Sequence, residues 1–290
     1  MLPIDLSGKR ALVTGVGDDS GFAWTITKYL NAAGADIVLA AQPNRMGILK
    51  RLLVRVTKET MQLPKPPGGV LEIEEVLPLD VSYDNLDNVT DEDWARAKIK
   101  NKDVDFSLAG ATKALEGKPI DIIVHAVAFA PEIMKNLLET SRKGYLIAMD
   151  VSSYSLSALC RTFLPNMEGR NGSVVGLTYL GGDRVAPLYG GGMGSAKAAL
   201  QIDCKQLASA MGPKGHRVNL VSAGAYPSRA GRAIPEFVRF LDIGAAKSPL
   251  QRNITREEVA AATAFLCCDL ASGITGEVMY VDAGYNVMAT

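Results

Sequence analysis

Short apolar runs alternate along this chain with longer stretches whose apolar residues recur at helical spacing. In the stretch 25–35, Ile26, Tyr29 and Leu30 share one face of a predicted helix. The runs with strand character are KRALVT (9–14), DIVLAA (36–41, ending at Gln42), LEIEEVLPLD (71–80), IDIIVHAVAFAP (120–131, reaching Ala128), GSVVGL (172–177), RVNLVSAG (217–224) and EVMYVDAG (277–284). This alternation predicts an α/β fold with a doubly wound parallel sheet of about seven strands and helices on both faces.

Helix and loop boundaries follow from the same pattern. The longer predicted helices cover 46–60, 141–167 and 193–211. Thr255 and Glu258 form a capping box that opens another helix. The polar stretch 82–117 is too long for an ordinary connection and predicts an insertion with a short helix or a mobile loop. With 290 residues, 48% of them hydrophobic, the chain suits a single domain over 1–290.

Composition narrows the classes of partner. The 31 basic and 31 acidic residues give zero net charge, which favours neither nucleic acid nor an anionic membrane. No apolar run has the roughly 18 residues of a spanning helix, and the N-terminus lacks the shape of a signal peptide. We therefore expect no membrane association, and a cytosolic protein or one whose targeting segment has been removed. The four cysteines are typical of buried thiols, and His125 and His216 are too far apart to predict a metal site.

The first strand runs into a glycine-rich turn. Gly15, Gly17 and Gly21 follow it, and a helix begins near Phe22. A strand, a glycine turn and a helix N-terminus form a Rossmann-type dinucleotide-binding opening, in which backbone N–H groups and the helix dipole face the pyrophosphate. The spacing is looser than GxGxxG, and a turn without a ligand is the alternative.

The residues after the second and third strands are candidates for the adenosine end of a dinucleotide. An acidic residue after the second strand would bind the ribose hydroxyls of NAD, whereas an arginine would favour the 2′-phosphate of NADP. Gln42 and Arg45 stand there, so this rule leaves NADH and NADPH open. Asp80 and Val81 are placed for an adenine contact. A strand-end cap for Asp80 and a surface amide for Gln42 are the alternatives.

The stretch TYLGGDRVAPLYGGGMGSAK contains the candidate catalytic residues Tyr179, Tyr189 and Lys197. An ammonium group beside a phenol stabilises the phenolate, so we expect Lys197 to lower the tyrosine pKa and form a proton-donating pair. The glycines at 190–192 disfavour helix, which places Tyr189 on a loop and begins the helix near Met193. Plain aromatic packing and a helix-surface lysine are the alternatives.

Several motifs occur along the chain in a fixed order: TG, HAVAFAP, SSYS, TYLGGDRVAPLYGGGMGSAK, RVNLVSAG and ITGEVMYVDAG. With these motifs the chain resembles the enoyl-acyl-carrier-protein reductases of type II fatty acid synthesis. These are a divergent branch of the short-chain dehydrogenase/reductase superfamily. The resemblance covers nearly the whole chain and mixes plastid-type features with the bacterial-type HAVAFAP. Ordinary members of the superfamily carry Tyr-x-x-x-Lys, which would put the tyrosine at position 193, now Met193. Displacement of the tyrosine to Tyr189 is typical of the enoyl reductases.

The resemblance implies reduction of the trans-2 double bond of enoyl thioesters in fatty acid elongation. Tyr189 would hydrogen-bond the thioester carbonyl, and Lys197 would hold the nicotinamide ribose. Tyr179 would line the substrate pocket and assist proton delivery, with Ala130 and Met193 also at the substrate. Cofactor contacts would come from Gly15, Gly21, Phe22, Gln42, Asp80, Val81, Val127, Lys197, Tyr226, Ser228 and Ala230. The resemblance further implies an acyl carrier protein partner, a homotetramer, and a location in a bacterial cytoplasm or in a plastid or apicoplast stroma.

Three departures from the family pattern lie near the predicted cofactor. Ala225 replaces a proline after the sixth strand, and Ala126 replaces a serine after the strand-four histidine. The plastid-type tryptophan after the second strand is absent. Gln42 nevertheless matches the NADH-using bacterial members, which favours NADH and leaves NADPH as the alternative.

Two other functions stay open. A carbonyl reductase of the wider superfamily would need a tyrosine at 193 and a serine near 180, where Met193 and Leu180 stand. A non-catalytic dinucleotide-binding protein would be consistent with the altered loop after Gly224. Segment 225–245 is expected to form a lid over an acyl tail, or a packed helix, through Phe237, Phe240, Leu241 and Ile243.

Overall fold

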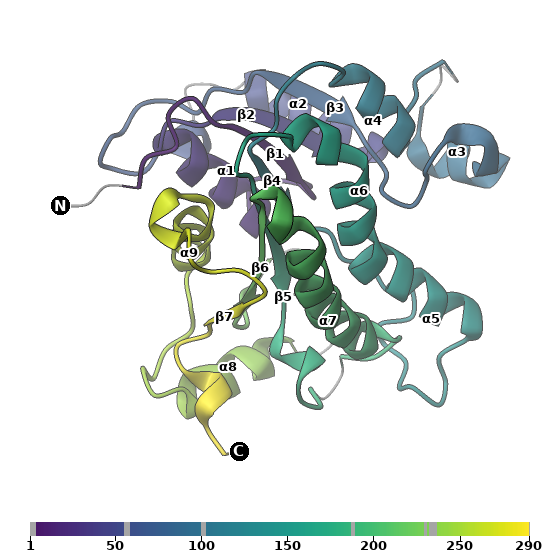
Figure 1. Cartoon of the computed structure of the whole chain (residues 1–290). Helices are drawn as coiled ribbons and strands as arrows, with labels where there is room; N and C mark the ends of the chain where they lie inside the picture. The colour runs from purple at the N-terminus through teal and green to yellow at the C-terminus, as the bar shows by residue number, and fades with distance from the viewer. Residues whose placement is uncertain are drawn as a thin grey trace.

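A parallel sheet forms the centre of the molecule (Figure 1). The computed structural model describes residues 4–54, 59–99, 103–186, 189–228, 231 and 237–289. Within them, seven strands are arranged in the order β3-β2-β1-β4-β5-β6-β7, and every neighbouring pair is parallel. The strands are β1 (Arg10–Thr14), β2 (Asp36–Ala41), β3 (Glu75–Pro78), β4 (Ile122–His125), β5 (Ser173–Thr178), β6 (Arg217–Ala223) and β7 (Val278–Val281).

Helices cover both faces of the sheet, as predicted. Successive side chains of a strand point to opposite faces, so Ala11 and Val13 enter one core while Leu12 enters the other. The first core contains side chains of α1 (Phe22–Ala32), α2 (Met46–Val54) and α9 (Arg256–Cys267). The second contains side chains of α4 (Leu108–Ala114), α6 (Ser155–Met167) and α7 (Met193–Met211). Figure 1 shows α9 on one side of the strands and α6 and α7 on the other.

Several predicted boundaries agree with the structure. Helix α7 spans Met193–Met211, and Thr255 and Glu258 make both bonds of the capping box that opens α9. The insertion carries two short helices, α3 (Asp91–Ala97) and α4. The remaining helices are α5 (Arg142–Met149) and α8 (Phe237–Lys247).

Other boundaries differ. Strand β4 ends at His125 rather than reaching Ala128, because the chain then leaves the ladder and passes over the glycine turn at Gly15. The predicted helix 141–167 is interrupted by a π-helical turn at Asp150–Tyr154, between α5 and α6. Strand β3 covers only Glu75–Pro78.

Three chemical features bear on function. All four cysteines are free and buried, as predicted. Among the described residues, no group of three or more histidine, cysteine or carboxylate side chains could hold a metal ion. No helix in the described part of the chain is both long enough and apolar enough to cross a membrane.

Candidate active site

The sheet order brings the predicted contact residues to one edge. Gln42 follows β2, Asp80 follows β3, Val127 lies just beyond β4, Tyr179 follows β5, and Tyr226 lies beyond β6. In a parallel sheet all carboxyl ends meet at the same edge, and here the strand order reverses between β1 and β4. Doubly wound folds bind dinucleotides in the crevice at such a reversal.

The glycine turn has the geometry that a dinucleotide needs. Gly15 has a φ of +82°, and a Cβ there would lie 2.1 Å from the carbonyl oxygen of Ala126, so only glycine allows this approach. Gly21 precedes α1 and has no side chain to cap it, so first-turn N–H groups are available to an anion. The Phe22 ring centroid lies 5.3 Å from that of Tyr226, which joins the turn to the loop after β6.

The residues predicted for the adenosine end form a second group along the same edge. Gln42 Nε2 donates to Asp80 Oδ2 at 3.3 Å, and the neighbouring Val81 is buried. Beyond β6, Ser228 Oγ accepts a hydrogen bond from the backbone N–H of Gly231 at 3.1 Å. Ala230, the last predicted cofactor contact, lies outside the described residues.

Tyr179 and Tyr189 are in direct contact. Their ring centroids are 4.9 Å apart and their planes meet at 63°, an edge-to-face arrangement. Tyr189 also packs against a small apolar cluster of Ala130, Ala148 and Met193. The structure therefore gathers the four residues that were predicted to contact substrate.

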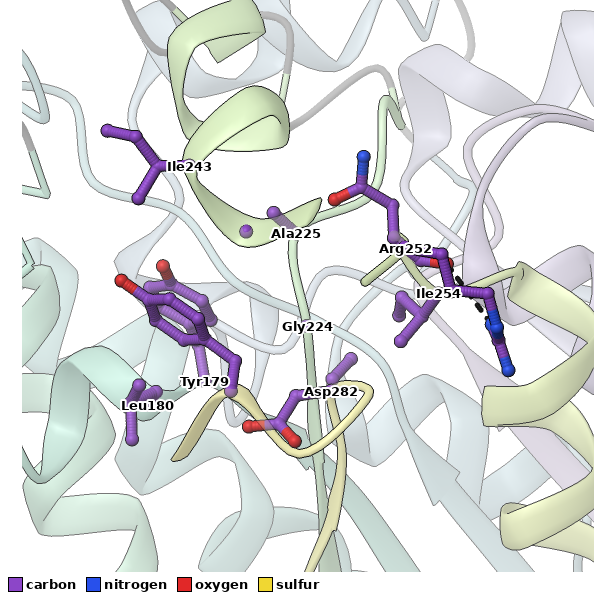
Figure 2. A pocket seen from close by; sticks show the side chains of 12 residues that line it. Tyr179, Leu180, Gly224, Ala225, Ile243, Arg252, Ile254 and Asp282 are labelled. Carbon is purple, nitrogen blue, oxygen red and sulfur yellow. Dashed lines mark hydrogen bonds between the residues drawn. The ribbon is translucent and has the colours of Figure 1, made fainter. Parts of the chain in front are cut away.

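Tyr179 also lines a cavity at the carboxyl edge of the sheet. Ala225, Ile243, Asp282 and Tyr285 contribute to its wall. Figure 2 shows Ala225 and Ile243 on one side of the cavity, with Tyr179 and Asp282 across from them. Ile243 belongs to α8, inside the segment predicted as a lid.

Sequence reasoning did not single out Asp282 and Tyr285. They follow β7, so the rule that carboxyl ends gather at one edge could have indicated them. Burial raises the pKa of Tyr179 to about 12, and Tyr285 and Asp282 add to the shift. Tyr179 is therefore a neutral phenol at neutral pH.

Lys197 is buried on α7, and its Nζ donates to the Leu177 carbonyl oxygen at 2.8 Å. Burial lowers the pKa of Lys197 to about 8. Lys197 was predicted to lower the pKa of the tyrosine beside it, and for Tyr189 this prediction is wrong. Burial, followed by the nearby Tyr179, raises the pKa of Tyr189 above its ordinary value. The reason is that loss of water around the phenol disfavours its charged form.

The glycines at 190–192 hold Tyr189 in place. Backbone N–H groups of Gly190 and Gly191 donate to the carbonyl oxygens of Ile133 and Lys135, at 3.1 Å and 2.8 Å. A Cβ at Gly190 would lie 1.9 Å from the Lys135 oxygen. The glycine run thus lets the tyrosine loop dock directly on the turn that follows Ala130.

Residues 91–286 match the family model described as enoyl-(acyl carrier protein) reductase. The chain belongs to this family. It is 42% identical to the chloroplastic, NADH-dependent enoyl-[acyl-carrier-protein] reductase 2 of Oryza sativa, over 99% of this chain and 77% of that protein. It is 36% identical to the NADH enzyme of Aquifex aeolicus, over 98% and 93% of the two chains. The Plasmodium berghei enoyl-acyl-carrier-protein reductase, solved with triclosan, superposes with a TM-score of 0.90 at 34% identity, over 97% of this chain and 98% of that one.

Proposed function

We propose that this chain is an NADH-dependent enoyl-acyl-carrier-protein reductase, which reduces the trans-2 double bond of an enoyl thioester. The observation that carries the proposal is the contact of Tyr189 with Tyr179, Ala130 and Met193. Met193, one turn before Lys197, is buried in this cluster and offers no phenol there. This arrangement disfavours the carbonyl reductase, which needs a tyrosine at that position.

The residues along the carboxyl edge fit a dinucleotide. The close approach at Gly15 and the uncapped first turn of α1 would accept the diphosphate. Gln42 would meet the adenosine ribose, and Asp80, bonded to Gln42, would lie beside it at the adenine. Val127, Tyr226, Ser228 and Lys197 would line the nicotinamide half. NADH, when bound, supplies the hydride that adds to the β-carbon of the enoyl chain.

The tyrosines and the lysine act on the acyl group. The Tyr189 phenol donates a hydrogen bond to the thioester carbonyl oxygen and stabilises the charge that develops there as hydride arrives. Its raised pKa keeps it protonated, which suits a donor. Lys197 contributes positive potential, and Tyr179 lies beside Tyr189 to help deliver the proton that completes the α-carbon.

We also propose the partner, assembly and location that the family suggests. The substrate is an acyl chain on acyl carrier protein, and the protein is a homotetramer. The exposed Leu146 on α5 and Ile202 on α7 are consistent with further helix packing between copies. The enzyme works in the cytoplasm of a bacterium or in a plastid or apicoplast stroma. Light scattering after gel filtration would test the assembly, with a mass about four times the 30.9 kDa chain expected.

Oxidation of NADH by the purified protein tests the activity itself. We expect turnover with crotonyl-coenzyme A and none with acetoacetyl-coenzyme A. The opposite preference would identify a ketone reductase. Nucleotide binding without turnover of either thioester would identify a non-catalytic protein.

A further inference from the structure

The π-helical turn Asp150–Tyr154 and the first residue of α6 face the segment that follows β4. Ser152 and Ser155, three positions apart, are both fully buried. The Ser152 hydroxyl contacts Phe129 in that segment, and the Ser155 hydroxyl contacts His125 at the end of β4. A π turn contains one more residue than an α-helical turn. Residues three apart lie on one side of a helix, so Ser152 and Ser155 can reach neighbouring parts of the chain.

Ser152 binds both backbone polar groups of one residue. Its Oγ accepts from the Phe129 N–H at 2.9 Å and donates to the Phe129 carbonyl oxygen at 3.0 Å. These are the bonds that a neighbouring strand would make with Phe129 if β4 continued. The serine therefore stands in for a sheet ladder at the point where the chain has left the sheet.

Ser155 holds the other end of the same segment. Its Oγ donates to the Val151 carbonyl oxygen at 2.8 Å, so its lone pair accepts from His125 Nε2, which lies 2.7 Å away. Burial lowers the pKa of His125 to about 3, so this imidazole stays neutral at neutral pH. The hydrogen bond between Ser155 and His125 is therefore insensitive to pH near neutrality.

The segment 125–129 is thus fixed at both ends by one helical turn. Val127 lies at its centre, Ala126 contacts Gly15, and Ala130 follows directly. We propose that Ser152 is a positioning residue, which fixes the 127–130 backbone as the surface on which the nicotinamide ring and the acyl chain meet. This proposal rests on the proposed function. It requires that Ser152 acts through Phe129 rather than by touching substrate.

Ser152→Ala, with Ser153→Ala as matched control, tests the proposal. Ser153 lies on the same turn, is equally buried, and donates to Asp203 Oδ2 of α7 at 2.7 Å, away from the segment. Both variants lose one buried hydroxyl, so similar decreases in thermal midpoint are expected. The rate of hydride transfer in a single turnover should fall by about 10- to 100-fold in Ser152→Ala only. The kinetic isotope effect on this rate, measured with NADH deuterated at the transferred position, should rise in Ser152→Ala.

Equal hydride-transfer rates in the two variants would overturn the proposal. Amide hydrogen exchange over 125–135 gives a second readout that needs no activity. Faster exchange in Ser152→Ala than in Ser153→Ala supports the proposal that Ser152 fixes this backbone, and equal exchange excludes it. If the wild-type protein lacks turnover, the proposed function fails while exchange still decides whether Ser152 holds the segment. Ser152→Cys, which keeps the size and weakens the donor, replaces Ser152→Ala should the latter not fold.

Discussion

At the scale of single residues, burial sets the protonation of the site. Lys197 and Tyr189 are both taken out of water, which lowers the pKa of the base and raises that of the acid. The motif predicted the opposite shift for Tyr189, because it shows an ammonium nearby but not the surrounding apolar atoms. In the structure the ammonium of Lys197 is directed at the Leu177 carbonyl.

Replacing the Tyr189 phenol should separate catalysis from binding. Tyr189→Phe keeps the ring that packs on Tyr179 and removes the donor to the carbonyl oxygen. We expect kcat to fall by about 100-fold or more, with NADH affinity unchanged. Steady-state kinetics and fluorescence titration would measure the two quantities. Tyr29→Phe, near the C-terminal end of α1, is the control. Equal losses of kcat and NADH affinity in Tyr189→Phe would contradict the assigned role.

The buried Lys197 should make the stability of the free protein depend on pH. Its pKa is about 8 in the folded chain and near 10.5 when unfolded, so below pH 8 the burial of its charge destabilises the fold by roughly 3 kcal/mol. Between these two pKa values the unfolded state binds more protons than the folded state, so the free energy of unfolding rises with pH. Relative to Lys197→Met, the wild type should therefore be less stable at pH 7, with the difference shrinking from pH 8 to 10.5.

Urea unfolding of both proteins at several pH values would measure this difference. The variant removes a titrating group of similar length, so other groups cancel in the comparison. A difference that does not change between pH 7 and 10.5 would show that Lys197 titrates normally.

At the scale of elements, the glycines at 190–192 determine where α7 begins and where Tyr189 lies. Sequence reasoning predicted the start at Met193 and the loop position of the tyrosine, because the low helix propensity of glycine acts locally. It did not predict that Gly190 would bond to Ile133 and Gly191 to Lys135, since these residues are far apart in the sequence. The same limit explains why the π turn was missed.

A methyl group at position 190 should displace the tyrosine loop. The Cβ of Gly190→Ala would lie 1.9 Å from the Lys135 carbonyl oxygen, and relieving this clash requires a shift of the backbone. We expect about a 10-fold or larger loss in kcat/KM, because a small displacement of a donor strongly weakens transition-state contacts. Gly212→Ala, at a position with open space around a Cβ, is the control and should retain activity. Unchanged kcat/KM in Gly190→Ala would show that the loop can move without harm.

At the scale of the whole molecule, the strand order determines which distant residues share a site. The order places Gln42 and Asp80 on one side of the reversal and Tyr179 and Tyr226 on the other. A dinucleotide would lie across both groups. Binding to the folded state alone should therefore stabilise the whole domain.

NADH should raise the thermal midpoint more than NADPH does. At a concentration of about 100 times Kd, binding contributes about 2.7 kcal/mol, or roughly 5–10 °C. The Asp80 carboxylate, 3.3 Å from Gln42 Nε2, would repel the 2′-phosphate of NADPH. Differential scanning fluorimetry with each nucleotide measures the preference. Asp80→Asn should narrow the gap, and a larger shift with NADPH in the wild type would contradict this account.

The fold class could be predicted from the amino-acid sequence. So could the succession of strands and helices along the chain, and the presence of Tyr179, Tyr189 and Lys197 in one motif. These follow from apolar periodicity and from glycine, which act between near neighbours in the chain. The folded structure was needed to find where β4 ends, which serines hold the segment 125–129, and in which direction the pKa of Tyr189 moves. Those properties depend on burial and on contacts between segments far apart in the sequence, and local pattern carries no record of them.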